Sequence, residues 1–171
     1  MSRSEQHPFL NNGNIHQCVQ TYAAGDLAAL PAEVRTIPMS DWAVSGVTDM
    51  RDLFRDLPPD FDIPPLNGWN VSQVTDMSRM FEYSTYDYPL DAWNVSRVTD
   101  MSSMFARSLF NHPLDAWNVS GVTDMSSMFE QSEFNHPLNA WNVSRVAHMW
   151  SMFAQSLFNH PLDAWNVSRV T

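Results

Sequence analysis

Apolar positions recur along most of this chain with a fixed period. The tryptophans mark the period, because the first two are 27 residues apart and every later neighbouring pair of the repeat is 24 residues apart. The six residues that set this spacing are Trp42, Trp69, Trp93, Trp117, Trp141 and Trp165. The three extra residues of the longer copy fall around "RDLPPDFDIPP", where a loop tolerates an insertion. Self-similarity at this period indicates a repeat architecture in which each copy forms one structural unit.

The first half of each copy predicts a short strand. Leu114, Trp117 and Val119 stand at i, i+3 and i+5, which is the L-x-x-L-x-L spacing of a leucine-rich repeat with Trp in the second slot. Side chains alternate along a strand, so Trp117 and Val119 are expected on the same face.

The second half of each copy predicts a short helix. In "VTDMSSMFEQS", Met125, Met128, Phe129 and Ser132 stand at i, i+3, i+4 and i+7, which is one stripe of a helix. Thr123 or Asp124 precedes this stripe and is a suitable N-cap, and the following "FNHP" turns the chain back.

These elements together predict an α/β repeat solenoid, a leucine-rich-repeat-like stack of strand–turn–short helix units. A single unit cannot bury its apolar stripe alone, but stacked units cover one another. The expected organisation is an N-terminal helical cap over residues 1–37, followed by residues 38–171 as about five full units and a truncated sixth. The predicted structural core is Trp69, Trp93, Trp117, Trp141, Val95, Val119, Met101, Met104, Phe105, Met125, Met128 and Phe129.

The two ends of the array differ in sequence. "IHQCVQTYAAGDLAALPAEV" has helical composition interrupted by Gly25 and stopped near Pro31, which suits a cap that covers the first repeat. The final "WNVSRVT" begins a sixth unit without a helix, and its open edge predicts a fragment of a longer array, self-association through that edge, or a frayed end.

Composition narrows the classes of partner. The formal net charge of −10 disfavours nucleic acid and anionic membranes. Cys18 is the one cysteine, which leaves no intrachain disulfide and predicts a buried, inert thiol. The N-terminal stretch has no apolar run long enough for a signal peptide or a membrane helix, so a cytoplasmic location is expected if this N-terminus is native.

The repeat phrase resembles that of a known family. "FNHPLDAWNVSGVTDMSSMF", residues 110–129, is similar to the repeat of the BspA-like leucine-rich repeat surface proteins, whose phrase is W-[ND]-[VT]-S-x-V-T-x-M-x-x-M-F. The resemblance covers residues 40–171. It implies a non-catalytic surface or interaction protein of bacteria or microbial eukaryotes, in some members an adhesin, and therefore a location at the cell surface.

Two columns of repeated residues contain potential metal ligands. His112, His136 and His160 recur at one position, and a column of aspartates recurs at another: Asp49, Asp76, Asp100 and Asp124, with His148 in the fifth copy. Imidazoles on successive strands would point in parallel rather than at one ion, and each aspartate is explained by a helix start. We therefore expect no metal site and no cofactor.

Repeated Asn-Val-Ser triplets occur at Asn70, Asn94, Asn118, Asn142 and Asn166. Each triplet meets the N-glycosylation pattern, but glycans on adjacent strands would collide. A ladder of asparagine amides that hydrogen-bond from unit to unit is the predicted role. The serines are also copied in every unit, whereas an active site needs one unique constellation, so no catalytic residue and no enzymatic activity are expected.

Recognition is expected where the copies differ. The predicted partner-binding residues are Trp150, His148, Arg97, Arg145 and Arg107. Trp150 stands where other copies have Ser or Arg, so it is either a binding anchor or a ring that covers apolar surface on its neighbour. The sequence therefore predicts a non-catalytic protein-binding or adhesion module with an unknown protein partner, with an intracellular scaffold and an ion-dependent array as the alternatives.

Overall fold

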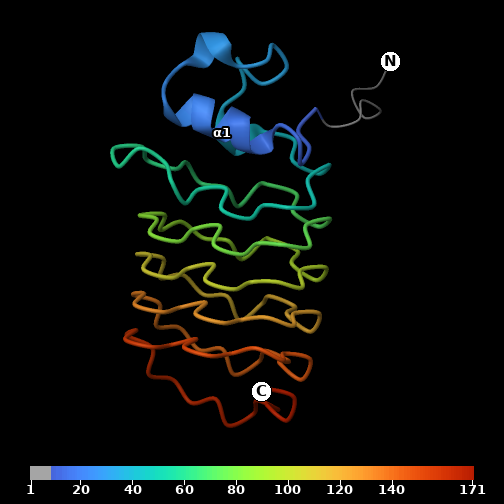
Figure 1. The fold of residues 1–171 in the computed structure, drawn as a ribbon, viewed down its shortest axis with the longest axis vertical. Coiled ribbons are helices and arrows are strands. Elements are labelled where there is room, and N and C mark those ends of the chain that lie inside the picture. Colours follow the sequence, from blue (N-terminus) through green and yellow to red (C-terminus); the bar gives the residue numbers. More distant parts are fainter. Residues whose placement is uncertain (1–8) are drawn as a thin grey trace.

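The computed structural model describes residues 9–171 and shows a helical N-terminal segment lying on a stack of chain layers (Figure 1). The helical elements are the α-helix α1 (Ile15–Ala23) and the 3-10 helices η1 (Leu27–Ala29) and η2 (Met39–Asp41). Residues 1–8 of the predicted N-terminal cap lie outside the described residues. None of the helices within residues 9–171 is long and apolar enough to cross a lipid bilayer.

Each layer of the stack is one sequence repeat, which we name by its tryptophan. The units are residues 39–65 (Trp42), 66–89 (Trp69), 90–113 (Trp93), 114–137 (Trp117), 138–161 (Trp141) and 162–171 (Trp165). Isolated parallel bridges join adjacent layers at one position per unit: Asp49 with Asp76, Asp76 with Asp100, Asp100 with Asp124, and Asp124 with His148.

The predicted α/β repeat solenoid is wrong. Within residues 42–171 the structure contains neither an α-helix nor a regular strand, only turns and single bridges. The segment predicted as a strand around Trp117 and the segment predicted as a short helix from Met125 to Ser132 are both irregular.

The reason lies in the backbone hydrogen bonds of the predicted helix, as residues 101–108 illustrate. Alternate N–H groups donate to carbonyls of the next unit: Met101 to Asp124, Ser103 to Ser126, Phe105 to Met128 and Arg107 to Glu130, at 2.7–3.0 Å. The N–H groups between them close turns within the unit: Met104 to Met101, Ala106 to Ser103 and Ser108 to Phe105. A helix would send each N–H to the carbonyl four residues earlier. Here neighbouring layers take half of these donors.

Residues with positive φ complete this arrangement. Ser103 has a φ of +55° and Arg107 a φ of +56°, values that an α-helix cannot contain. The third residue of a β-turn, which Ser103 and Arg107 each occupy, takes a positive φ in the type II geometry. The spacing of apolar residues is nevertheless satisfied, because Met101, Met104 and Phe105 are fully buried.

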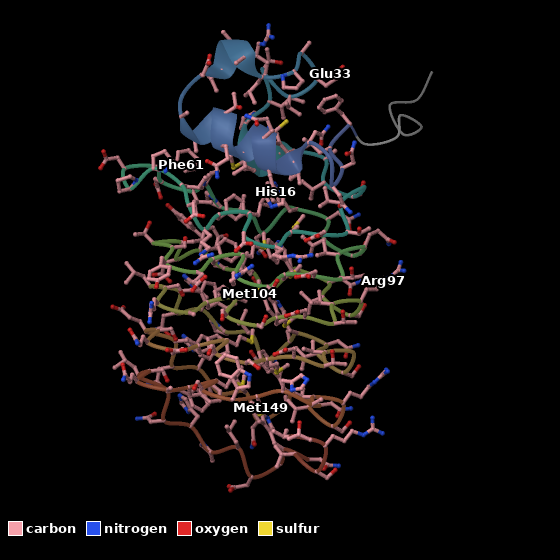
Figure 2. All side chains as sticks on the ribbon, in the orientation of Figure 1. His16, Glu33, Phe61, Arg97, Met104 and Met149 are labelled. Carbon is pink, nitrogen blue, oxygen red and sulfur yellow. The ribbon has the colours of Figure 1, made fainter. Side chains whose placement is uncertain are left out.

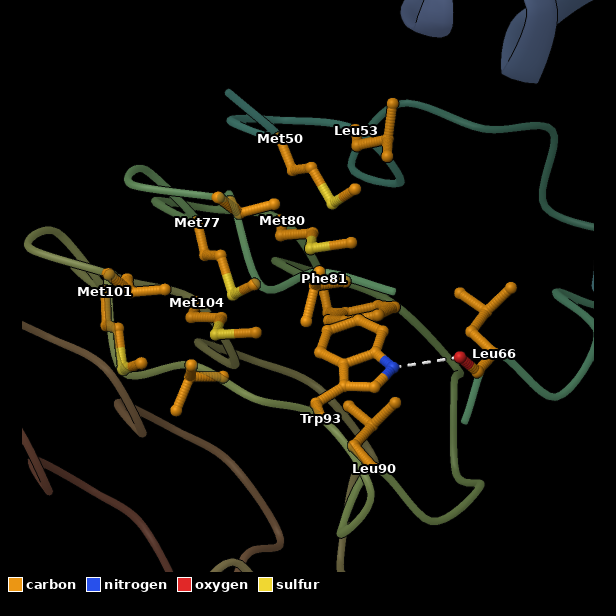
Figure 3. Close-up of a cluster of buried hydrophobic side chains, with 14 of the residues drawn as sticks. Met50, Leu53, Leu66, Met77, Met80, Phe81, Leu90, Trp93, Met101 and Met104 are labelled. Atoms are coloured by element: carbon orange, nitrogen blue, oxygen red, sulfur yellow. Dashed lines mark hydrogen bonds between the residues drawn. The ribbon is translucent and has the colours of Figure 1, made fainter. Parts of the chain in front are cut away.

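The tryptophans join each layer to the one before it. The indole N–H of Trp93 donates to the carbonyl of Leu66 at 2.9 Å (Figure 3), and the Trp69, Trp117, Trp141 and Trp165 indoles make the equivalent bond to the preceding unit. The rings of Trp93 and Trp117 stack at 6.5 Å with an interplanar angle of 4°. Tryptophan therefore supplies apolar area and a hydrogen-bond donor at the same junction, which no other side chain combines on this scale.

Two further aromatic columns lie beside the tryptophans. Phe105 stacks on Phe129 at 5.7 Å, and Phe110 stacks on Phe134 at 6.4 Å. The columns meet where Phe105 contacts Phe110 at 4.4 Å. All twelve residues predicted as the structural core are no more than 3% exposed.

The N-terminal segment lies against the Trp42 unit. The side-chain oxygen of Asn12 accepts the N–H groups of Thr48 and Asp49 at 2.8 and 3.1 Å, and Nε2 of His16 lies 2.6 Å from the carbonyl oxygen of Arg51. Gly25, with a φ of +75°, follows the end of α1, where a left-handed residue commonly stops a helix. Burial raises the pKa of the Cys18 thiol, which lowers its thiolate fraction and its reactivity.

Candidate functional site

A groove of about 350 Å³ runs across several layers on the side of the stack that carries the aspartate column. Its lining combines acidic, hydroxyl, basic and aromatic side chains from five units: Arg51, Asp76, Ser78, Arg79, Asp100, Ser102, Ser103, Asp124, Ser126 and Trp150. We call it the Asp/Ser groove. It depends on stacking, because no single unit contributes more than three of these residues.

The aspartates of the groove are fixed by their own units. Oδ1 of Asp100 accepts the N–H of Ser102 at 2.9 Å and its hydroxyl at 2.7 Å, and Asp76 holds Ser78 in the same way. Each is an aspartate turn in which the side chain satisfies the backbone two residues later. The prediction that these aspartates cap helices is therefore wrong, because their carboxylates stabilise turns instead. The second oxygen of Asp100 has no hydrogen-bond partner within residues 9–171.

Basic residues stand at the N-terminal end of the groove. Arg51 contacts Asp49 at 2.9 Å and Asp76 at 3.3 Å. The hydrogen bond with Asp49 and the charge of Asp76 raise the pKa of the Arg51 guanidinium above its ordinary value. Arg79 pairs with Asp52 at 3.0 Å. The negative charge of the groove is thus compensated at this end.

Trp150 stands at the C-terminal end. Its side chain occupies the position of Ser102 and Ser126 in the two preceding units, and it is 64% exposed. Ser126 is only 3% exposed and its hydroxyl has no hydrogen-bond partner, whereas Ser102 is half-buried and bonded to Asp100. His148, which replaces the aspartate of this unit, is exposed and bridges Asp124 through its backbone.

The other predicted partner-binding residues lie outside the groove. Arg97 projects from the edge of the stack (Figure 2) and donates to the side chain of Gln73, and Arg145 is also exposed. Arg107 packs over the Tyr83 ring at 5.0 Å and donates to its hydroxyl. Of the five predicted residues, the groove therefore includes Trp150 and has His148 next to it.

Sequence reasoning missed the serines of the groove. Their signal was present, because Ser78, Ser102 and Ser126 recur two positions after an aspartate, the spacing of an aspartate turn. This spacing did not single out the serines, because the same positions also fit the polar face of a helix.

The histidine column has a structural explanation. Nε2 of His112, His136 and His160 lies 2.9, 3.0 and 3.1 Å from a backbone carbonyl oxygen of the preceding unit. Each imidazole ring is therefore held by a backbone carbonyl of the unit that precedes its own. The three rings are not directed at a common point. Among residues 9–171 no three His, Cys, Asp or Glu side chains are arranged to hold a metal ion.

The predicted asparagine ladder is wrong for the Asn-Val-Ser triplets. Each of these asparagines accepts the N–H of the serine two residues later within its own unit, as Asn118 does with Ser120 at 3.2 Å. A ladder between units exists at a different column, in which the side-chain oxygens of Asn111 and Asn135 accept the N–H groups of Asn135 and Asn159 at 3.0 and 3.1 Å.

A protein-family model matches most of this chain. A family described as "Mycoplasma protein of unknown function, DUF285" matches residues 28–131 and, in a second alignment, residues 86–171. No curated protein and no solved structure matches the chain. The two aligned ranges include every unit of the stack.

Proposed function

The chain belongs to the DUF285 family, and from that premise we propose that it is a non-catalytic binding module that holds a protein partner in the Asp/Ser groove. The observation that carries this proposal is Trp150, an indole 64% exposed at one end of a groove of fixed carboxylates. Large aromatic side chains are enriched among the residues that dominate binding energy at protein interfaces.

The chemistry of the groove favours a basic segment of the partner. Asp100 and Asp124 lie between the compensated end at Arg51 and the ring of Trp150. The formal net charge of −10 also attracts a cationic partner over a longer range. A Lys or Arg side chain in the groove could pair with a carboxylate, and one at its end could lie over the indole.

The test is binding of a fluorescein-labelled peptide of alternating Lys and Ser, followed by anisotropy. Trp150→Ser installs the residue that three other units carry, and Asp100→Asn removes one charge while keeping the shape. Each substitution is expected to weaken binding about tenfold, which corresponds to about 1.4 kcal/mol. Asp115→Asn is the matched control, because Asp115 is exposed and lies outside the groove. Equal weakening by Asp115→Asn would show attraction to net charge alone and contradict the proposal.

We further propose that the module acts at the cell surface as an adhesin. The support is the resemblance of residues 110–129 to the repeats of BspA-like surface proteins. Protease treatment of intact source cells, followed by detection with an antibody against the repeats, tests this location. Loss of the epitope supports display outside the cell, and survival until lysis supports the intracellular scaffold instead.

A further inference from the structure

Three successive junctions of the stack share two backbone hydrogen bonds just after the phenylalanine of the Met-Phe pair. Where the Trp69 unit meets the Trp93 unit, the Tyr83 N–H donates to the Ala106 carbonyl at 3.0 Å. At the same junction the Ser84 carbonyl accepts the Leu109 N–H at 3.2 Å. Both bonds recur at the next two junctions, at 2.7–3.3 Å. They join the backbones of adjacent layers on this side of the stack.

Both bonds are absent where the Trp42 unit meets the Trp69 unit. Phe54 still donates its N–H to the Met80 carbonyl at 3.0 Å. Beyond it, the four equivalent groups have no hydrogen-bond partner within residues 9–171: the Asp56 N–H, the Glu82 carbonyl, the Leu57 carbonyl and the Thr85 N–H. A short stretch of unpaired backbone therefore lies inside the stack, and it offers a donor and an acceptor as the edge of a sheet does.

The inserted loop, residues 56–65, explains the interruption. Pro58 and Pro59 have no N–H to donate, and the Pro58 carbonyl accepts the Phe61 N–H at 3.0 Å, so the loop closes a turn on itself. Phe61 then packs edge-on against Tyr22 of α1, with ring centroids 6.2 Å apart, and Figure 2 places Phe61 at the edge of the stack near the N-terminal segment. The loop is therefore held towards α1 instead of pairing with the Trp69 unit.

A cavity of about 60 Å³ lies between the inserted loop and the Trp69 unit. We call it the notch. The residues that shape it are Leu57, Pro58, Phe61 and Ile63 of the Trp42 unit, and Tyr83 and Thr85 of the Trp69 unit. A water molecule occupies about 30 Å³ in the liquid. The notch therefore has room for a small aliphatic side chain but not for an aromatic ring.

The inserted loop makes the surroundings of the notch acidic. Asp56, Asp60 and Asp62 are exposed, and none of them forms an ion pair within residues 9–171. Arg55 also lines the notch, but its guanidinium is paired with Glu82 at 2.8 Å. Carboxylates without a partner favour lysine or arginine on whatever binds beside them.

We propose that the notch binds an extended segment of a partner protein, one with a small aliphatic side chain between lysines or arginines. A carbonyl of the segment accepts the Thr85 N–H, and an N–H of the segment donates to the Glu82 carbonyl, which restores the pairing that the inserted loop interrupts. Side chains alternate along an extended segment, so the aliphatic residue enters the notch while its neighbours face the aspartates. The notch shares no lining residue with the Asp/Ser groove and does not depend on the function proposed there.

The probe is a synthetic peptide, Lys-Ser-Lys-Val-Lys-Ser-Lys, and the control peptide has serine in place of the valine. Exchange of the Thr85 amide with solvent is measured by NMR on the full chain, which distinguishes the notch from the Asp/Ser groove. With the valine peptide free at ten times its dissociation constant, this exchange is expected to slow about tenfold. The dissociation constant read from the same amide is expected to be about tenfold weaker for the serine peptide, which leaves the notch unfilled.

Two variants of the chain sharpen the test. Asp60→Lys reverses one charge beside the notch and is expected to weaken binding of the valine peptide at least about tenfold. Asp115→Lys is the matched control, because it changes the net charge equally at an exposed residue outside the notch. Unchanged exchange at Thr85 with the valine peptide, or equal weakening by both variants, would overturn the proposal. Protection of the Thr85 amide in the free chain that disappears on dilution would overturn it in favour of a second copy of the chain.

Discussion

The Trp117 and Trp165 units contain the same six residues, Asp-Ala-Trp-Asn-Val-Ser, at 115–120 and 163–168, yet they are buried to different extents. Trp117 is 3% exposed and Val119 2%, whereas Trp165 is half-buried and Val167 is 50% exposed. Both indoles donate to the leucine carbonyl of the preceding unit at 2.9 Å. The contact with the preceding layer is therefore the same in both units. The difference in burial comes from the following layer.

This comparison separates two contributions to stability in a stack. Hydrogen bonds to the preceding unit are complete as soon as a unit is added, but burial of its apolar side chains is completed only by the next unit. A repeat protein of this kind is stabilised by interfaces between neighbours, so identical residues have different energies at different positions.

The largest expected effect compares the two tryptophans directly. Trp117→Ala is expected to lower the free energy of unfolding by about 3 to 5 kcal/mol, because it removes a fully buried ring and leaves a cavity. Trp165→Ala is expected to cost less than half as much, since its ring is covered on one side only. Urea denaturation of both variants measures the difference, and equal losses would show that burial by the following layer contributes little.

Buried and half-buried positions can also be compared by the pH dependence of stability. The relevant residues form one column of stacked rings: Tyr86, Phe110, Phe134 and Phe158. Burial raises the pKa of Tyr86 to about 12. The hydroxyl accepts the N–H of Leu66 at 3.1 Å. Because the folded-state pKa lies above the unfolded value, the stabilisation is complete below pH about 10 and is lost as the pH rises towards about 12, by about 2 to 3 kcal/mol.

Two substitutions test that assignment. Tyr86→Phe is expected to remove this part of the pH dependence, as measured by urea denaturation across the alkaline range. Phe158→Tyr places a tyrosine at the half-buried end of the same column, and its tyrosinate absorbance is expected to titrate at a lower pH than that of Tyr86. If both tyrosines titrated together, position in the stack would not control the shift.

A smaller loss of stability is expected when a residue with positive φ is substituted, and this loss should be the same in inner and outer units of the stack. Ser103 and Ser151 both have a φ of +55°, and a β-branched residue is strongly disfavoured there. Ser103→Val and Ser151→Val are each expected to cost about 1 to 2 kcal/mol in thermal or urea unfolding. A much larger loss for Ser103→Val would mean that its neighbours, rather than its own backbone, determine the cost.

The smallest expected effect concerns Trp150. Trp150→Ser is expected to change the free energy of unfolding by less than about 0.5 kcal/mol, because most of the ring is exposed. Thermal unfolding of this variant beside Trp117→Ala checks the contrast. A large fall in melting temperature would indicate that the ring mainly covers the buried Ser126 and Ser127.

The sequence by itself determined the repeat and the residues that enter the core. It did so because the identity and spacing of Trp, Val, Met and Phe decide which positions must leave water. The same sequence predicted a helix that does not form. A stripe at i, i+3, i+4 and i+7 is produced equally by a helix and by consecutive turns that bury the same side chains.

Only the tertiary structure decided between these backbones. The N–H of Met101 can reach a carbonyl of its own unit or that of Asp124 in the next layer, and that choice depends on the distance between layers, which no local pattern records. The Asp/Ser groove and the exposure of Trp150 follow from the same stacking. They are properties of neighbouring layers, so they exist only once the units have been brought together.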